Sequence, residues 1–233
     1  MRWLLFCTCW TFLLGWTSRY VLVNAELVII RKVNKKDVYH KDRFNIRRSK
    51  CTDIRQGNKC KIYGGFERSP SNPCKCHCPP RMGTMTQQNK KWRCTSNEEL
   101  REREGCGFYF LYESSESFVR VLIGNKWQFF QAPHTGCAVN KVNTSYLSCN
   151  GSWVSIPNMV NHVDVIMRGF DQVARGYAYQ IRVKKDRFLA GKLIKLYLNC
   201  SPFGGNPCLL IKMKGNQNCK CELRLITRTC III

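Results

Sequence analysis

The cysteines constrain this chain more than any other feature of its sequence. The 233 residues include 16 cysteines, and two of them, Cys7 and Cys9, lie in a segment with the layout of a secretion signal. Removing that segment leaves an even set of fourteen, which is typical of a disulfide framework formed in an oxidising compartment. Spacing alone does not determine which cysteines pair. We predict that all fourteen form disulfides: Cys51, Cys60, Cys74, Cys76, Cys78, Cys94, Cys106, Cys137, Cys149, Cys200, Cys208, Cys219, Cys221 and Cys230.

The first 25 residues are predicted to be a signal peptide. Arg2 precedes an uncharged apolar run from Trp3 to Trp16, and Val23-Asn24-Ala25 supplies small residues for cleavage after Ala25. The run is shorter than the roughly 20 residues that cross a hydrocarbon core. Charged residues or Asn interrupt every later apolar segment. We therefore expect a secreted, extracellular protein without a transmembrane anchor; an uncleaved signal anchor is the alternative.

A zinc site is the alternative use of the cysteines. Cys74, Cys76, His77 and Cys78 are close enough in sequence to suggest metal ligands. Zinc sites favour cysteine pairs separated by two to four residues, together with an equally regular second pair. The C-x-C-x-C spacing lacks that regularity, so we expect disulfides here, with no metal and no cofactor.

Three Asn-x-Ser/Thr sequences are candidate glycosylation sites, at Asn143, Asn150 and Asn199. In a chain routed through the secretory pathway, such a sequence marks a potential glycan in a surface segment. The middle residue of the third is Cys200, which we expect in a disulfide. Asn199 is therefore the weakest candidate of the three.

The positive charge points to polyanions. The formal net charge is +23, and about +21 remains after the signal peptide with Arg2 and Arg19 is removed. Such a field attracts sulfated glycosaminoglycans, anionic lipids, acidic matrix proteins or mineral, and nucleic acid; a solvated surface that only maintains solubility is the alternative. Residues 26–50 hold a dense group of cations and no cysteine, so we predict a flexible basic arm, in which 25–30 adds at most an edge strand. Its predicted polyanion-binding residues are Arg31, Lys32, Lys35, Lys36, Arg47, Arg48 and Lys50.

Residues 51–106 form a predicted cysteine-rich module. They contain seven cysteines and several Gly and Pro turn residues but few apolar residues, so disulfides must replace a large core. Because seven is odd, at least one cysteine should pair outside the module. A short charged helix is expected over 98–104.

Residues 107–233 are predicted to form an antiparallel β-sandwich or barrel. Alternating apolar runs occur at 118–123, 127–130, 162–167, 177–183, 193–198, 209–213 and 222–228. Gly124-Asn125 predicts a hairpin between the first two runs, and residues 215–218 predict a turn between the last two. The expected fold class is therefore mostly β, preceded by a small disulfide-rich, loop-rich module.

A segment of the β-domain, about residues 149–183, resembles the second half of a CUB domain. The resemblance is carried by Cys149-Asn150-Gly151, in which Asn150 takes the place of the family's glycine, by Ile156-Pro157, by the apolar run 163–167 and by Gly176-Tyr177-Ala178-Tyr179. It implies that these strands close a β-sandwich. The acidic residues of that family's calcium site have no clear match upstream, so we carry over no metal site.

No catalytic constellation is recognisable, and we expect no enzymatic activity. The mature chain has four histidines, at 40, 77, 134 and 162, and their spacing does not suggest a paired acid and base around a lysine. The sequence has no serine-hydrolase, metalloprotease or papain-like motif. The favoured hypothesis is an extracellular binding or matrix protein that contacts polyanions or other secreted or cell-surface proteins. A growth-factor-like ligand or cationic defence protein is the alternative, and a basic secreted hydrolase is a third.

The signal and disulfide predictions can be tested together by mass spectrometry of the unreduced, secreted protein. We expect a chain that starts at Glu26 and contains no free thiol, because the oxidising compartment converts all fourteen cysteines. Several alkylatable thiols, or a chain that retains Cys7 and Cys9, would contradict these predictions.

Overall fold

The structure is a computed structural model that describes twelve stretches of the chain, namely 27–33, 40–47, 51, 59–110, 118–132, 135–140, 142–156, 158, 161–172, 176–184, 187–201 and 208–219. The predicted signal peptide and the predicted strand at 222–228 lie outside these residues. Among the described residues, no helix is long and apolar enough to span a membrane.

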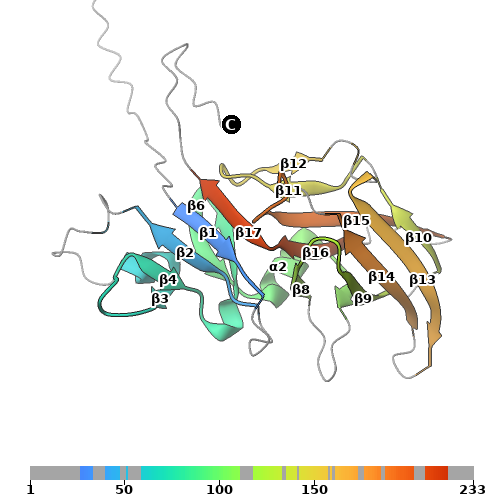
Figure 1. The fold of residues 1–233 in the computed structure, drawn as a ribbon, viewed down its shortest axis with the longest axis horizontal. Helices are drawn as coiled ribbons and strands as arrows, with labels where there is room; N and C mark the ends of the chain where they lie inside the picture. The colour runs from blue at the N-terminus through green and yellow to red at the C-terminus, as the bar shows by residue number, and fades with distance from the viewer. Residues whose placement is uncertain are drawn as a thin grey trace, which may run out of the picture.

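An antiparallel five-stranded sheet lies at one end of the molecule (Figure 1). Its strands, in spatial order, are β17 (Gly215–Cys219), β1 (Leu27–Arg31), β2 (Arg43–Ile46), β4 (Lys75–His77) and β3 (Phe66–Glu67). The sheet thus takes strands from the predicted arm, from the cysteine-rich module and from the C-terminal domain. All three segments contribute to one folded unit.

Two further sheets pack face to face as a sandwich. The six-stranded sheet contains β12 (Trp153–Ser155), β11 (Ser145–Leu147), β15 (Leu193–Ser201), β16 (Cys208–Met213) and β8 (Val119–Leu122), with β10 (Thr135–Val139) paired to β15. The four-stranded sheet contains β13 (Val163–Asp171), β14 (Gly176–Val183), β9 (Trp127–Ala132) and β7 (Tyr109–Phe110). The predicted mostly β, sandwich-like fold is confirmed, and the sheets do not close into a barrel.

Several short elements complete the fold, and Met85, Trp92 and Leu100 of the hairpin and helix among them pack into the core shared by the five-stranded and six-stranded sheets. The short elements are a hairpin of β5 (Thr84–Gln88) and β6 (Lys91–Thr95), the helix α2 (Asn97–Glu104) and the 3-10 turns η2 (Lys59–Tyr63) and η3 (Pro80–Met82). The predicted helix at 98–104 is therefore confirmed. Ser96 caps it by accepting a hydrogen bond from the Glu99 amide at 3.0 Å, and Gly105 ends it in the left-handed conformation.

The centre of the six-stranded sheet is buried on both faces. One face packs against the five-stranded sheet and α2 through Leu193 and Leu210, and the other packs against the four-stranded sheet through Ile194 and Ile211. All six residues of β16 are consequently buried. A strand covered on both sides is normally apolar throughout, yet Lys212 lies in this one and is 0% exposed.

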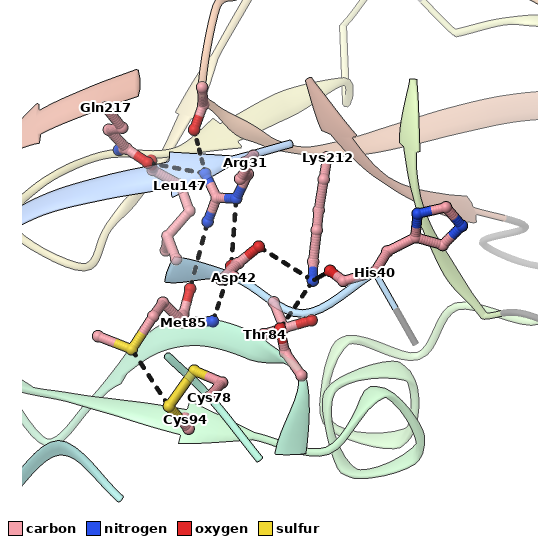
Figure 2. A network of polar contacts seen from close by, with 12 residues as sticks. Arg31, His40, Asp42, Cys78, Thr84, Met85, Cys94, Leu147, Lys212 and Gln217 are labelled. Carbon is pink, nitrogen blue, oxygen red and sulfur yellow. Dashed lines mark hydrogen bonds and ion pairs between the residues drawn. A yellow bond between two sulfur atoms is a disulfide. The ribbon is translucent and has the colours of Figure 1, made fainter. Parts of the chain in front are cut away.

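Lys212 belongs to a buried ionic network between the sheets (Figure 2). Its ammonium group lies 3.1 Å from Asp42 Oδ1 and donates to the carbonyl oxygens of His40 and Gly83, at 3.0 and 2.9 Å. The other oxygen of Asp42 accepts from Arg31 Nε at 3.3 Å. Arg31 and Asp42 are also 0% exposed, so two cations share one carboxylate away from water.

The Arg31 guanidinium also binds the C-terminal strand of the five-stranded sheet. It donates to Gln217 Oε1 at 3.0 Å and to the Gly191 carbonyl, while Gln217 donates to the Leu147 carbonyl at 2.9 Å. Gly191 has a φ of +75°, and an added Cβ would lie 2.2 Å from the backbone of Asn216. Any larger residue at position 191 would clash with β17. Glycine lets this turn lie close enough to the strand for Arg31 to bind both of them.

Among the described residues, six disulfides join these layers. Three are local, Cys51–Cys74, Cys60–Cys76 and Cys78–Cys94, and three link distant segments, Cys106–Cys208, Cys137–Cys200 and Cys149–Cys219. Cys106 thus pairs outside the cysteine-rich module, as the odd count predicted. Cys74, Cys76 and Cys78 each belong to a different disulfide, which removes the thiolates that the zinc alternative required. Cys221 and Cys230 lie outside the described residues.

Three expectations from the sequence need correction. The strand expected within 25–30 does form, as β1, but it is an interior strand between β17 and β2 rather than an edge strand, and residues 43–46 form strand β2 rather than part of a flexible arm. The predicted turn at 215–218 is instead part of strand β17. Gly124-Asn125 does form a turn, but β8 and β9 leave it for different sheets: β8 runs parallel to β16, whereas β9 pairs with β14.

Replacing Asp42 by Asn tests whether the buried network holds the layers together. The substitution leaves two buried cations without a carboxylate, so we expect a loss of about 3–5 kcal/mol in the free energy of unfolding, measured with urea. The matched control is Asp164→Asn, which removes a partly exposed carboxylate from Arg182 and should cost about 1 kcal/mol or less. Equal losses in the two variants would contradict the role assigned to Asp42.

Candidate polyanion-binding surface

The outer side of the five-stranded sheet carries a concentrated group of cations. Successive residues of a strand point to opposite faces, so the burial of Leu27, Ile29 and Arg31 turns the intervening residues outward. The same alternation buries Asp42, immediately before β2, and Phe44 within it. We define the basic face as the outward cations of this sheet and its flanking residues: Lys32, Lys41, Arg43, Arg47, Arg68 and Lys75.

The register of the sheet brings these side chains together from distant parts of the sequence. Arg43 on β2 is opposite His77 on β4, and His77 is opposite Phe66 on β3. Two positions further along β2, Asn45 is opposite Lys75. Neighbouring strands lie about 4.8 Å apart, so the cations form a compact array rather than a scattered distribution.

The two described carboxylates of this sheet and its flanking residues, Asp42 and Glu67, lie on its inner side. Asp42 is buried within the ionic network. Glu67, the acidic residue of these five strands, is opposite the buried Cys76 and so follows the inward alternation. The outward positions of the sheet are therefore positive or neutral, which concentrates the potential on one face.

The pKa of His77 reflects this positive potential. Its ring packs edge-on against Phe66, with 3.9 Å between the ring centroids. Burial lowers the pKa of His77 below its ordinary value of 6.5, and the charges of Lys41, Arg43 and Arg68 lower it further. The neutral imidazole is thus favoured at neutral pH, because a further positive charge is repelled there.

The predicted polyanion-binding residues have different outcomes. Lys32 and Arg47 lie on the basic face and are exposed, whereas Arg31 is buried and ion-paired, so it does not reach a surface ligand. Lys35, Lys36, Arg48 and Lys50 lie outside the described residues. The sequence prediction missed Lys41 and Arg43, which the alternation of β2 places outward, and Arg68 and Lys75, which only the strand pairing brings to this surface.

The candidate glycosylation sites lie on the sandwich. Asn143, Asn150 and Asn199 are all exposed, in the turn before β11, the turn between β11 and β12, and strand β15. Asn140 donates from its side-chain amide to Asn199 Oδ1 at 2.7 Å, and its own Oδ1 accepts from the backbone amide of Asn143 at 3.2 Å. Two of the three candidates are thus close in space. Their glycosylation remains a prediction.

The histidines occupy varied environments. His40 is buried and offers its carbonyl to Lys212, His77 lies among the cations of the basic face, and His162 precedes β13. His134 lies outside the described residues. Within the described part of the chain, no cluster of three or more His, Cys, Asp and Glu side chains is arranged to hold a metal ion.

Comparison with known proteins found no match to a family model, to a curated protein or to a solved structure. The resemblance to a CUB domain remains a prediction from the sequence.

The pKa of His77 provides a test of the potential at the basic face. We expect its ring to titrate below pH 6.5 in NMR spectra of the folded protein, and Arg43→Gln or Arg68→Gln to move the pKa upward. As the pH falls below 6.5, His77 is protonated in the unfolded chain before it is protonated in the folded protein, because its pKa is lower in the folded protein. Stability should therefore decrease on acidification, and His77→Gln should remove that contribution. Titration of His77 above pH 6.5 would contradict this account.

Proposed function

We propose that this protein is a secreted, glycosylated, non-enzymatic binding or matrix protein that holds extracellular polyanions on its basic face. Six cations on one side of a single sheet carry the proposal. Sulfated glycosaminoglycans are the ligand class that fits best, because they are linear, densely anionic and abundant outside cells.

The energetics of this surface favour polyanions. Each anion that pairs with a lysine or arginine releases condensed counterions, so several neighbouring contacts add to a strong, salt-dependent affinity. The field extends over a Debye length of roughly 8 Å at physiological salt, which accelerates capture. Asn45, which lies among these cations, offers an amide that can donate to sulfate or hydroxyl oxygens.

The rigidity of the sheet also supports the proposal. Cys60–Cys76 attaches β4 to η2, and Cys149–Cys219 attaches the end of β17 to the sandwich. A surface that is already ordered loses little conformational freedom when a ligand binds. The disulfides further indicate an extracellular, oxidising environment, in agreement with the predicted signal peptide.

A cationic defence protein is less well supported than a polyanion-binding protein. Agents that insert into membranes usually present a basic amphipathic helix. The helix α2 instead carries charges of both signs, with acidic Glu98 and Glu99 and basic Arg101 and Arg103. The concentrated cations of this protein lie on a sheet. A growth-factor-like ligand would differ by showing saturable cell binding that survives removal of cell-surface glycosaminoglycans.

Chromatography on immobilised heparin tests the proposed function. We compare a basic-face variant, with Lys32, Arg43, Arg68 and Lys75 replaced by Gln, with a control in which four exposed lysines elsewhere are replaced by Gln, namely Lys90, Lys91, Lys126 and Lys214. The two variants have equal net charge. The basic-face variant should elute at much lower salt, and the slope of log affinity against log salt should flatten by about one for each cation that no longer pairs with a sulfate.

Equal elution shifts in the two variants would mean that heparin responds to net charge alone, which would refute a specific basic face. Urea unfolding of both variants serves as the folding control. All eight side chains lie on the surface, so we expect changes of about 0.5 kcal/mol or less at each position.

A further inference from the structure

A second surface lies on the outer side of the four-stranded sheet, across β9, β14 and β13. Phe129, Gln180 and Ile166 form one row across these strands, and Trp127, Arg182 and Asp164 form the next. We call this surface the aromatic face and define it by these six residues together with Arg168 and Lys184.

Two apolar side chains of the aromatic face are exposed to solvent. Phe129 is 46% exposed and Ile166 is 40% exposed, although each neighbours residues that face the core. On the opposite side of the same strands, Phe130, Tyr179 and Ile181 are almost completely buried. One side of this sheet thus builds the sandwich, while the other presents an aromatic and an aliphatic side chain to solvent. These two apolar side chains lie in one row with Gln180 between them, and the row offers a partner an apolar contact at each end.

The polar side chains around this pair are held in place by one another. Arg182 lies 4.5 Å from the centre of the Trp127 ring and donates to Asp164 at 2.9 and 2.6 Å. Arg168 donates to Gln180 Oε1 at 2.6 Å, beside the apolar row. A guanidinium group that is already oriented loses little freedom when a partner binds.

We propose that the aromatic face docks an acidic protein surface that lays a large apolar side chain across the row of Phe129, Gln180 and Ile166. Trp, Phe and Arg are enriched at protein interfaces, and an apolar centre surrounded by charged groups is their usual arrangement. The surrounding cations, Arg168, Arg182 and Lys184, outnumber the carboxylate of Asp164. The complementary partner is therefore negative at its rim.

Two other occupants fit this surface less well. A sulfated polysaccharide would complement the cations, but it has no apolar group to bury against Ile166. A second copy of the chain would bring like charges together at Arg168, Arg182 and Lys184, and the protein already carries a net charge of +23. An acidic protein with an apolar anchor satisfies both the charge and the apolar row.

This inference goes beyond the polyanion-binding proposal and does not depend on it. The basic face is formed by β1, β2, β4 and β3, whereas the aromatic face is formed by β9, β14 and β13, toward the other end of the long axis (Figure 1). A ligand on either surface leaves the other accessible, so the two activities can be measured separately.

Three short synthetic peptides of matched length provide the test. One alternates Glu with Leu, one alternates Glu with Ser, and one alternates Lys with Leu, and each is titrated into the full-length secreted protein by calorimetry. The Glu-Leu peptide should bind at least about tenfold more tightly than either of the others, because only it supplies both the charge and the apolar anchor.

Substitutions then locate the site of binding. Phe129→Thr and Ile166→Thr should each weaken the Glu-Leu peptide by about tenfold, and Arg168→Gln should weaken it and reduce its salt dependence. Ile62→Thr and Val154→Thr remove exposed apolar side chains elsewhere and should have no effect. None of the Thr variants should change elution from heparin. Hydrogen exchange with bound peptide should show protection in β13 and β14.

Several results would overturn the proposal. Equal binding of the Glu-Ser peptide would show that the face responds to charge alone, and equal binding of the Lys-Leu peptide would show that it responds to apolar groups alone. Absence of binding by all three peptides would also refute it. Dimerisation detected by sedimentation and abolished by Phe129→Thr would identify a second copy as the occupant instead.

Discussion

The buried contact of Asp42 with Arg31 and Lys212 is the interaction on which the arrangement of the layers depends. One carboxylate faces two cations at 3.3 and 3.1 Å, and all three side chains are 0% exposed. Buried charges of unequal number are costly unless other dipoles compensate them. Here the carbonyl oxygens of His40, Gly83 and Met85 accept from the two cations. The network thereby joins the N-terminal strands, the β5–β6 hairpin and the centre of the sandwich.

The same network also determines which cations reach the surface. A strand has a side-chain period of two, so a shift of one residue would exchange its inner and outer faces. Fixing Arg31 inward turns Ile30 and Lys32 outward, and fixing Asp42 inward turns Lys41 and Arg43 outward. The charges that hold the layers together and the charges that form the basic face are therefore alternate members of the same segments. Their division of roles follows from the register.

Local patterns in the sequence predicted the elements well but predicted their partners poorly. The charged stretch at 98–104 and the alternating apolar runs near β13 to β16 identify their elements without tertiary information. Gly124-Asn125 produces the expected turn with Asn125 at a φ of +64°, but the strands on either side join different layers of the sandwich. Likewise, nothing local indicates that residues 215–219 pair with 27–31. The basic face was located only in part, because Arg68 and Lys75 approach Arg43 through such long-range pairing.

The two surfaces are fixed relative to each other because the connection between them is covalent and densely packed. One apolar core contains Leu27 and Phe44 of the five-stranded sheet together with Leu193 and Leu210 of the sandwich. Cys106–Cys208 and Cys149–Cys219 add crosslinks that span 102 and 70 residues of sequence. A protein held by its basic face on an immobile polyanion would therefore present the aromatic face in a restricted orientation. A partner bound to the aromatic face would be held next to the polyanion, because the protein that carries it stays attached through the basic face.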